Sequence, residues 1–395
     1  MARRHAGLAA LSLSLGLSAV PALAWEQEDV LARLKTSLAE QTLEIEWQGV
    51  SGSGNDLVLE GVSAGIVNVG ERVSIGSVTL SGIEDGEDDT VVIGSIALPT
   101  WEFTSPEGGV ISVRSLEIAG QVLPGPATTD ELNKLGLYDS FTVGGLEVTN
   151  KGAKILSASD LAVNLERDDA GVLHAEGGLD AFQIDFTTFP DEKAKAALAA
   201  FGHTIMSGGM SFESSWNPQT GQFTSDQIAL TVDDAATLSL ALDLSGYTLA
   251  FVKQAREFSA RSNEAKTDEE KMAQGMMMIG MMQTLVLSSA SIRIDDDGLT
   301  EKALAFFGQQ QGVSATDAAN QVKGMVPFMM AQLNNAELTQ MVSTAVNTYI
   351  DNPQSLTLSA TPAAPTPFAQ LMAAGMGGDP TAIIAALGLK LVANE

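Results

Sequence analysis

The chain has 395 residues, with 21 basic and 49 acidic side chains, a formal net charge of −28 and no cysteine. This charge argues against binding to nucleic acid or to anionic lipid head groups, because both would be repelled. No disulfide can hold the fold, so its stability must come from buried apolar area, which a chain of this length can supply.

Residues 1–24 have the features of a secretory signal. Arg3 and Arg4 precede an apolar stretch over residues 6–20, and Ala22 and Ala24 are small residues where a signal peptidase cleaves. The stretch is shorter than the roughly 18 to 20 residues that span a bilayer. We therefore expect a mature chain from Trp25 with no transmembrane segment, in the periplasm or, as the alternative, outside the cell.

Residues 25–247 are predicted to form a β-rich region behind one helix. Val30, Leu31, Leu34 and Leu38 fall on one face of a helix over 26–41. A short pattern of a hydrophobic residue, two residues that are mostly small, and a second hydrophobic residue then recurs. Its copies lie in residues 75–80, 93–98, 113–118, 143–148 and, more loosely, 158–163. Their intervals are too irregular for a solenoid but suit antiparallel strands, whose small residues would let a sheet curve.

Residues 248–395 are predicted to be rich in helices, with strands returning near 290–294 and 356–358. Ser314 and Asp317 form a capping box for one helix, which Pro327 should kink or break. The fold class expected for the chain is therefore α+β: a long, curved antiparallel meander that forms a groove, covered or flanked by amphipathic helices. A short further helix is expected over 191–201.

No catalytic constellation is apparent in the sequence. Beyond the signal, only His174 and His203 remain, and neither has a partner at metal-ligand spacing. Asp295–Asp297 is interpreted as a turn and helix cap, because it lacks the alternating oxygen ligands of a calcium loop. We expect no cofactor, no metal and no enzymatic activity. The abundant carboxylates leave a hydrolase with two acidic residues as an alternative.

Methionines are the compositional oddity of the chain. Two clusters stand out, one in residues 272–282 and one in residues 325–330. Such clusters can be adaptable core packing, a deformable lining for an apolar ligand or partner, or a Cu(I) site. The lining is predicted to comprise Met272, Met276, Met278, Met281, Met282, Met325 and Met329.

The recurring strand pattern, the hairpin at 216–223 and the segments 294–300, 352–358 and 362–367 are similar to those of uncharacterised proteobacterial exported proteins. More distantly, the meander resembles the AsmA-like envelope proteins. That second resemblance implies a curved sheet whose groove carries or guards lipids. We therefore expect a soluble periplasmic binding or scaffold protein that holds an apolar or lipidic envelope component. An envelope protein that docks on another protein, without a small ligand, is the alternative; the oligomeric state is left open.

Overall fold

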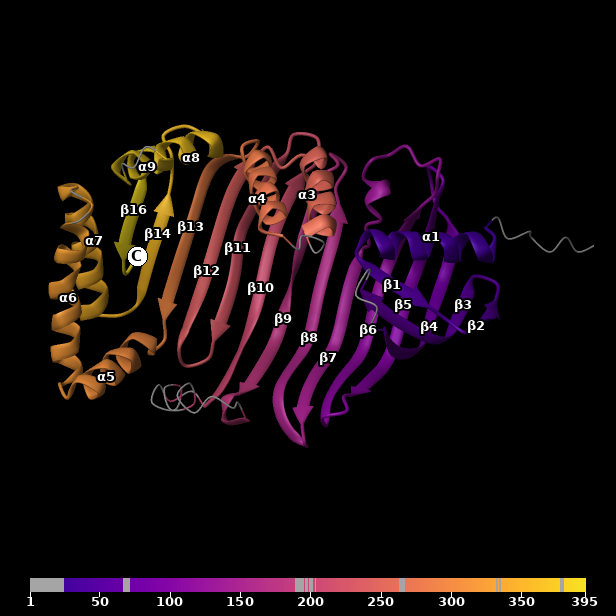
Figure 1. Cartoon of the computed structure of the whole chain (residues 1–395), viewed down its shortest axis with the longest axis horizontal. Coiled ribbons are helices and arrows are strands. Elements are labelled where there is room, and N and C mark those ends of the chain that lie inside the picture. Colours follow the sequence, from indigo (N-terminus) through magenta and orange to yellow (C-terminus); the bar gives the residue numbers. More distant parts are fainter. Residues whose placement is uncertain are drawn as a thin grey trace, which may run out of the picture.

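Strands dominate the chain after its first helix. The computed structural model describes residues 25–66, 72–188, 195, 198, 202, 204–262, 267–331, 333, 335–376 and 380–395. Within this part of the chain, 16 strands form one antiparallel sheet. Figure 1 shows it as a long, open band with β1 to β3 at one end and β16 at the other. The predicted α+β class, with a long curved sheet and helices concentrated in the C-terminal part, is confirmed.

Neighbours in the sheet follow chain order from β3 to β14, and β16 closes the series. β1 and β2 both pair with β3, and β15 pairs with β13 beside β14. The strands are β1 (Leu43–Glu46), β2 (Gly49–Ser53), β3 (Asp56–Ile66), β4 (Arg72–Asp85), β5 (Thr90–Thr104), β6 (Gly109–Pro124), β7 (Ser140–Asn150), β8 (Ala153–Arg167), β9 (Leu173–Asp185), β10 (Ile205–Asn217), β11 (Gln222–Val232), β12 (Ala236–Ser245), β13 (Val286–Asp296), β14 (Ser355–Ala360), β15 (Thr366–Pro367) and β16 (Leu389–Ala393). The sheet therefore continues across residue 247, where the sequence changes character.

The helices lie between these strands. They are α1 (Gln27–Glu40), α3 (Leu249–Ser262), α4 (Asp268–Met282), α5 (Leu299–Gln311), α6 (Ala315–Ala331), α7 (Ala336–Asp351), α8 (Phe368–Met376) and α9 (Pro380–Leu387), with short 3₁₀ turns η1 (Asn133–Leu135) and η2 (Phe186–Thr188). The helix predicted over 26–41 is confirmed by α1, and the helices expected beyond residue 247 are confirmed by α3 to α9. The signal segment and His203 lie outside the described residues, and so does the helix expected over 191–201 except for residues 195 and 198.

Of the kink or break expected at Pro327, the break is wrong. α6 runs without a break through Pro327 to Ala331. A proline removes one backbone hydrogen bond and crowds the preceding turn, at a cost of about 3 kcal/mol. α6 packs against both α5 and α7, and this contact with neighbouring helices holds the helix together across the proline.

The closed core of the protein lies under α1. Val30, Leu31 and Leu34 of this helix are at most 7% exposed and pack on β3, β4 and β5. The buried residues of this core are Trp25, Val30, Leu31, Leu34, Leu57, Leu59, Val62, Leu80, Ile83, Val91, Ile93 and Leu123. Figure 1 shows α1 lying across the front of these strands. α1 therefore covers an apolar face of the sheet, and it does so at the N-terminal end of the sheet, over β3 to β6.

The recurring strand pattern has a backbone function in addition to the curvature expected of it. A regular strand places residues three apart on opposite faces. Leu80 and Ile83 nevertheless both lie in the α1 core, with Gly82 at φ 66° between them. On β5, Ile93 lies in this core and Ile96 packs against it, although they too are three residues apart. Gly94, between them, lies directly opposite Gly82. The small residues thus reset the alternation, so that apolar side chains stay on one face along an entire strand.

Two glycines in the middle of the sheet make room for aromatic rings. Gly177 of β9 pairs with Phe212 of β10, and Gly208 of β10 pairs with Phe182 of β9. A Cβ atom on Gly177 would lie 3.0 Å from the Phe212 ring, and one on Gly208 would lie 3.1 Å from the Phe182 ring. Both would also meet a carbonyl oxygen of a neighbouring strand. The two rings therefore cover backbone that has no side chain of its own.

This packing predicts the effect of adding a methyl group. Gly208→Ala should destabilise the protein by about 1 to 3 kcal/mol, because the new Cβ has no space. Gly324→Ala in α6 is the control: no heavy atom lies within 4 Å of its added Cβ, and alanine favours a helix by about 0.8 to 1 kcal/mol. Urea unfolding midpoints test the pair. If Gly208→Ala unfolds at the same urea concentration as the parent protein, the close packing is wrong.

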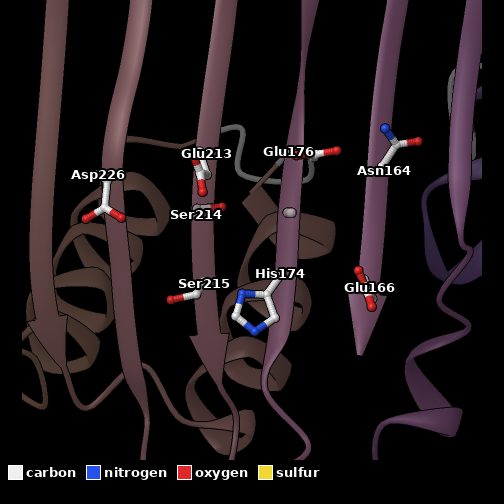
Figure 2. Close-up of a pocket in the computed structure, with 9 residues that line it drawn as sticks. Asn164, Glu166, His174, Glu176, Glu213, Ser214, Ser215 and Asp226 are labelled. Atoms are coloured by element: carbon white, nitrogen blue, oxygen red, sulfur yellow. The ribbon is translucent and has the colours of Figure 1, made fainter. Parts of the chain in front are cut away.

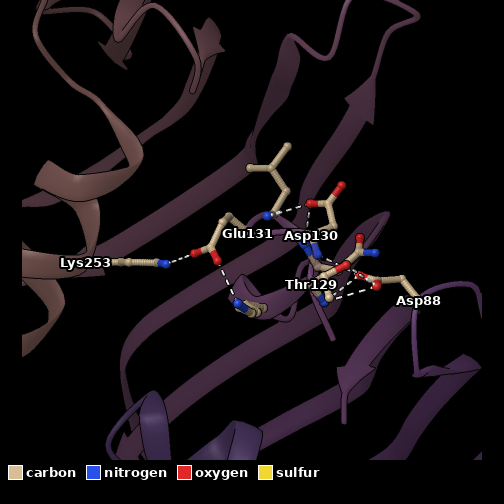
Figure 3. A network of polar contacts seen from close by, with 8 residues as sticks. Asp88, Thr129, Asp130, Glu131 and Lys253 are labelled. Atoms are coloured by element: carbon tan, nitrogen blue, oxygen red, sulfur yellow. Dashed lines mark hydrogen bonds and ion pairs between the residues drawn. The ribbon is translucent and has the colours of Figure 1, made fainter. Parts of the chain in front are cut away.

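Two aspartates fix the segment that crosses from β6 to β7 (residues 125–139). Asp88 and Asp89 both adopt positive φ in the β4–β5 turn. Asp88 accepts hydrogen bonds from the Thr129 hydroxyl at 2.6 Å and the Asp130 N–H at 2.7 Å. Asp89 joins Arg33 of α1 at 2.9 Å. These contacts, shown in part in Figure 3, tie the crossing segment to α1 and the closed core.

The crossing segment in turn fixes α3. Glu131 forms ion pairs with Lys134 at 2.6 Å and with Lys253 of α3. These two lysines lower the pKa of Glu131 to about 2. The guanidinium of Arg256 donates to the Leu135 carbonyl at 3.3 Å. α3 is thereby placed next to the segment that adjoins the closed core.

The aspartate contacts predict a loss of stability in acid. The Thr129 hydroxyl is the main cause that holds the pKa of Asp88 below its ordinary value of 3.8, and the Ala127 N–H does the same for Asp89. A carboxyl with a lowered folded-state pKa stabilises the fold fully above its unfolded pKa, and this stabilisation disappears as the pH falls through the folded value.

Urea midpoints should therefore fall as the pH drops below about 4. Asp88→Asn should lower the midpoint at neutral pH and make the decline in acid shallower. Glu107→Gln, in an exposed turn, is the control and should leave both unchanged. An identical acid profile for Asp88→Asn and the parent protein would contradict this role of Asp88.

Candidate functional site: the open apolar face

Apolar side chains cross the whole sheet in straight rows at right angles to the strands. Residues that pair across antiparallel strands point to the same face. One row, from β4 to β16, is Leu80, Ile96, Ile118, Phe141, Val163, Gly177, Phe212, Ile228, Leu240, Ile292, Leu358 and Leu391. Leu80 lies in the α1 core, so the entire row faces the side of the sheet that α1 covers.

A second row runs parallel to the first on the same face. From β5 to β14 it is Leu98, Leu116, Val143, Leu161, Leu179, Met210, Leu230, Leu238, Ile294 and Leu356. Every member is aliphatic except Met210, which carries a thioether. The two rows together make a continuous hydrocarbon surface along the sheet.

Burial changes along each row. Leu80 is fully buried, whereas Leu240 and Ile292 of the same row are 36% and 47% exposed. In the second row, Leu98 is 8% exposed and Leu230 is 41% exposed. We call the exposed part of the two rows the open apolar face. It comprises Met210, Ile228, Leu230, Leu238, Leu240, Ile292 and Leu358, from β10 to β14.

The open apolar face has no means of recognising polar groups. Its backbone N–H and C=O groups are used in the pairing of β10 to β14. Its side chains are hydrocarbon and one thioether, which donate no hydrogen bonds. Five strands at about 4.8 Å spacing span about 19 Å. One leaflet of a bilayer has a hydrocarbon depth of about 15 Å, so the face matches the length of an acyl chain.

Helices frame the face at both ends of its strands. α3 and α4 connect β12 to β13 and lie at the same strand ends as α8 and α9. α5, α6 and α7 connect β13 to β14 at the opposite ends, and α7 packs on β14 and β16. Leu249 of α3 packs near Trp216 and Leu173, in a small second core. Helices thus stand at the margins of the apolar face, which is exposed across β10 to β14.

The predicted methionine lining is divided between two places. Met272, Met276, Met278, Met281 and Met282 lie on α4, whereas Met325 and Met329 lie on α6, well apart from α4 in Figure 1. Met272 and Met276 are 68% and 63% exposed, and Met325 and Met329 are 57% and 61% exposed. These methionines are not core packing. The structure does not bring the two clusters together into one lining.

The polar face of the sheet carries a depression of about 380 Å³ over β8 to β11 (Figure 2). Its chemistry-bearing residues are Asn164, Glu166, His174, Glu176, Glu213, Ser214, Ser215 and Asp226. Glu176 and Glu213 pair directly across β9 and β10. From the sequence, His174 has no partner at metal-ligand spacing. In the structure, its Nε2 atom lies 3.3 Å from a carboxylate oxygen of Asp168.

These groups do not form a catalytic set. A nucleophile must be hydrogen-bonded to its base. The Ser215 hydroxyl instead bonds the Thr224 hydroxyl at 2.6 Å and points away from His174 in Figure 2. Glu176 and Glu213 are both exposed, so nothing here shields a carboxyl group from water, as a general acid would require. The depression offers solvated carboxylates rather than an organised site.

Asp296 confirms the interpretation of the acidic turn as a helix cap. Its carboxylate accepts from the Gly298 N–H at 2.9 Å and from the Thr300 N–H and hydroxyl at 2.9 and 2.6 Å, where α5 begins. Tyr349 of α7 also donates to it at 2.9 Å. Within the described ranges, no group of three or more His, Cys, Asp or Glu side chains could hold a metal ion.

The sequence contained a signal for the strands of this site but not for its exposure. Ile228 and Leu230 are separated by Ala229, and Leu238 and Leu240 by Ser239, so large apolar residues recur with the period of two that strands have. That pattern is the same whether a helix covers the strand or not. The seven residues of the open apolar face were therefore not identified as site residues.

Comparison with known proteins adds a family model described as an uncharacterized protein, which matches residues 229–394. The match begins in β11 and ends one residue after β16, so it includes most of the open apolar face and both methionine clusters. No curated protein matches the chain. Among the described helices, none is both long and apolar enough to cross a membrane.

Proposed function

We propose that this protein binds the acyl chain of an amphipathic lipid on its open apolar face and acts as a carrier or guard of that lipid rather than as an enzyme. The proposal rests on one observation about the row that starts at Leu80. Its residues are buried under α1 at the N-terminal end of the sheet, and residues of the same types are exposed from β10 to β14. Leu230, Leu238 and Leu240 would lie in a protein core if they were covered.

The chemistry of the face favours hydrocarbon as the occupant. A polypeptide partner in an extended conformation brings polar backbone groups that need partners, and the middle of a sheet supplies none. An acyl chain has no such groups, and each methylene removed from water contributes about 0.8 kcal/mol. The net charge of −28 disfavours an anionic head group. The ligand proposed is therefore a neutral or zwitterionic lipid.

The proposed location is the periplasm, on the basis of the signal at residues 1–24. Expression in a bacterium should give protein in the periplasmic fraction whose intact mass corresponds to a chain from Trp25. A cytoplasmic protein that keeps residues 1–24 would contradict both the location and the processing.

Substitutions on the two faces of one strand test the lipid site. Leu230 faces the open apolar face, and its chain neighbour Thr231 faces the opposite side. Leu230→Glu should weaken the binding of a fluorescent lysophosphatidylcholine about tenfold or more, because a carboxylate would contact the acyl chain. Thr231→Glu adds the same charge on the polar face and should bind like the parent protein.

Fluorescence titration measures the effect, and circular dichroism checks that both variants are folded. Equal weakening in both variants would show that charge, not the apolar face, controls binding. No binding by the parent protein would contradict the proposed function. A binding partner that proves to be a protein, insensitive to Leu230→Glu, would favour the alternative of an envelope interaction protein.

A further inference from the structure

An apolar helix stands at the end of the strands that carry the open apolar face. α4 begins with charged residues at Asp268, Glu269, Glu270 and Lys271, and a Thr267–Glu270 capping box fixes its start. From Met272 to its end it carries no charge. A helix with this division is polar at its start and apolar over the rest of its length.

The apolar side chains of α4 are exposed rather than packed. Met272, Met276 and Ile279 are 68%, 63% and 48% exposed. They are spaced i, i+4 and i+7, so they lie on one side of the helix. Met277, Met278 and Met282 add exposures of 50%, 45% and 36%. α3 is the neighbour against which α4 packs, and no heavy atom lies within 4 Å of a Cβ built on Gly275 or Gly280.

We propose that α4 docks on the surface of a zwitterionic lipid bilayer, by inserting its exposed side chains among the lipids, and so places the open apolar face next to the source of its ligand. This inference rests on the proposed lipid-binding function. A lipid carrier has to meet a bilayer to load, because free lipid is scarce in water.

Charge and area favour a bilayer over a second copy of the chain. A second copy would bring another formal charge of −28, and the two would repel. Specific protein interfaces use roughly 20 to 30 residues a side. α4 offers six large exposed apolar side chains, well short of that number. Insertion into a bilayer needs only a small apolar face, and flexible methionines adapt to fluid lipid.

Flotation with vesicles of phosphatidylcholine and phosphatidylethanolamine tests the docking. The mature parent protein should float with the vesicles, and added salt should not release it, because the attraction is apolar. The double variant Met276→Glu/Ile279→Glu should float at least tenfold less, since two carboxylates would have to enter the interface. Phe328→Glu on α6 is the matched control, because Phe328 is 77% exposed on a different helix.

Binding of soluble lysophosphatidylcholine separates this inference from the proposed function. The α4 double variant should keep that binding, and Leu230→Glu should lose it while it still floats. A parent protein that binds soluble lipid but does not float overturns the docking and leaves the lipid site intact. A parent protein that floats without binding soluble lipid supports the docking and overturns the proposed function. Equal loss of flotation in Phe328→Glu, or a dimer that the α4 variant converts to a monomer, contradicts the role given to α4.

Discussion

Continuous antiparallel pairing from strand to strand is the constraint on which the rest of the described structure depends, because it keeps apolar side chains on one face from β4 to β16. Water makes an apolar face of this extent unfavourable, at roughly 25 cal/mol for each Å² left exposed. α1 and the crossing segment relieve this cost at the N-terminal end, where residues such as Leu59 and Ile93 are fully buried. The helices beyond β12 pack on one another and on β14 and β16. The free-energy cost of exposed apolar surface therefore remains across β10 to β14.

The sequence predicted much of this fold for physical reasons that are local. The recurring pattern in segments such as 75–80 and 93–98 indicated strands, and the spacing of Val30, Leu31 and Leu34 indicated α1. The Ser314–Asp317 capping box is present, with the Ser314 hydroxyl accepting the Asp317 N–H at 3.1 Å. Pro327 failed as a helix breaker because contacts with α5 and α7 outweigh a local preference.

The candidate site was less accessible from the sequence, because exposure is decided by segments far away in the chain. Leu80 and Leu240 have the same side chain and belong to the same row, yet only Leu80 has α1 above it. Methionine composition drew attention to α4 and α6, but not to their separation or exposure. A strict period of two also places Leu80 and Ile83 on opposite faces, whereas the positive φ at Gly82 brings them to the same face.

Native mass spectrometry of the protein, isolated without detergent from the periplasm of its own cells, tests the central claim most directly. The account predicts a population that carries one or more molecules of lipid mass, released on collisional activation and identified as neutral or zwitterionic. The same adduct should be depleted in Leu230→Glu. A protein that is uniformly free of lipid in this measurement, with its folded charge-state distribution intact, would contradict the claim that the open apolar face is a lipid site.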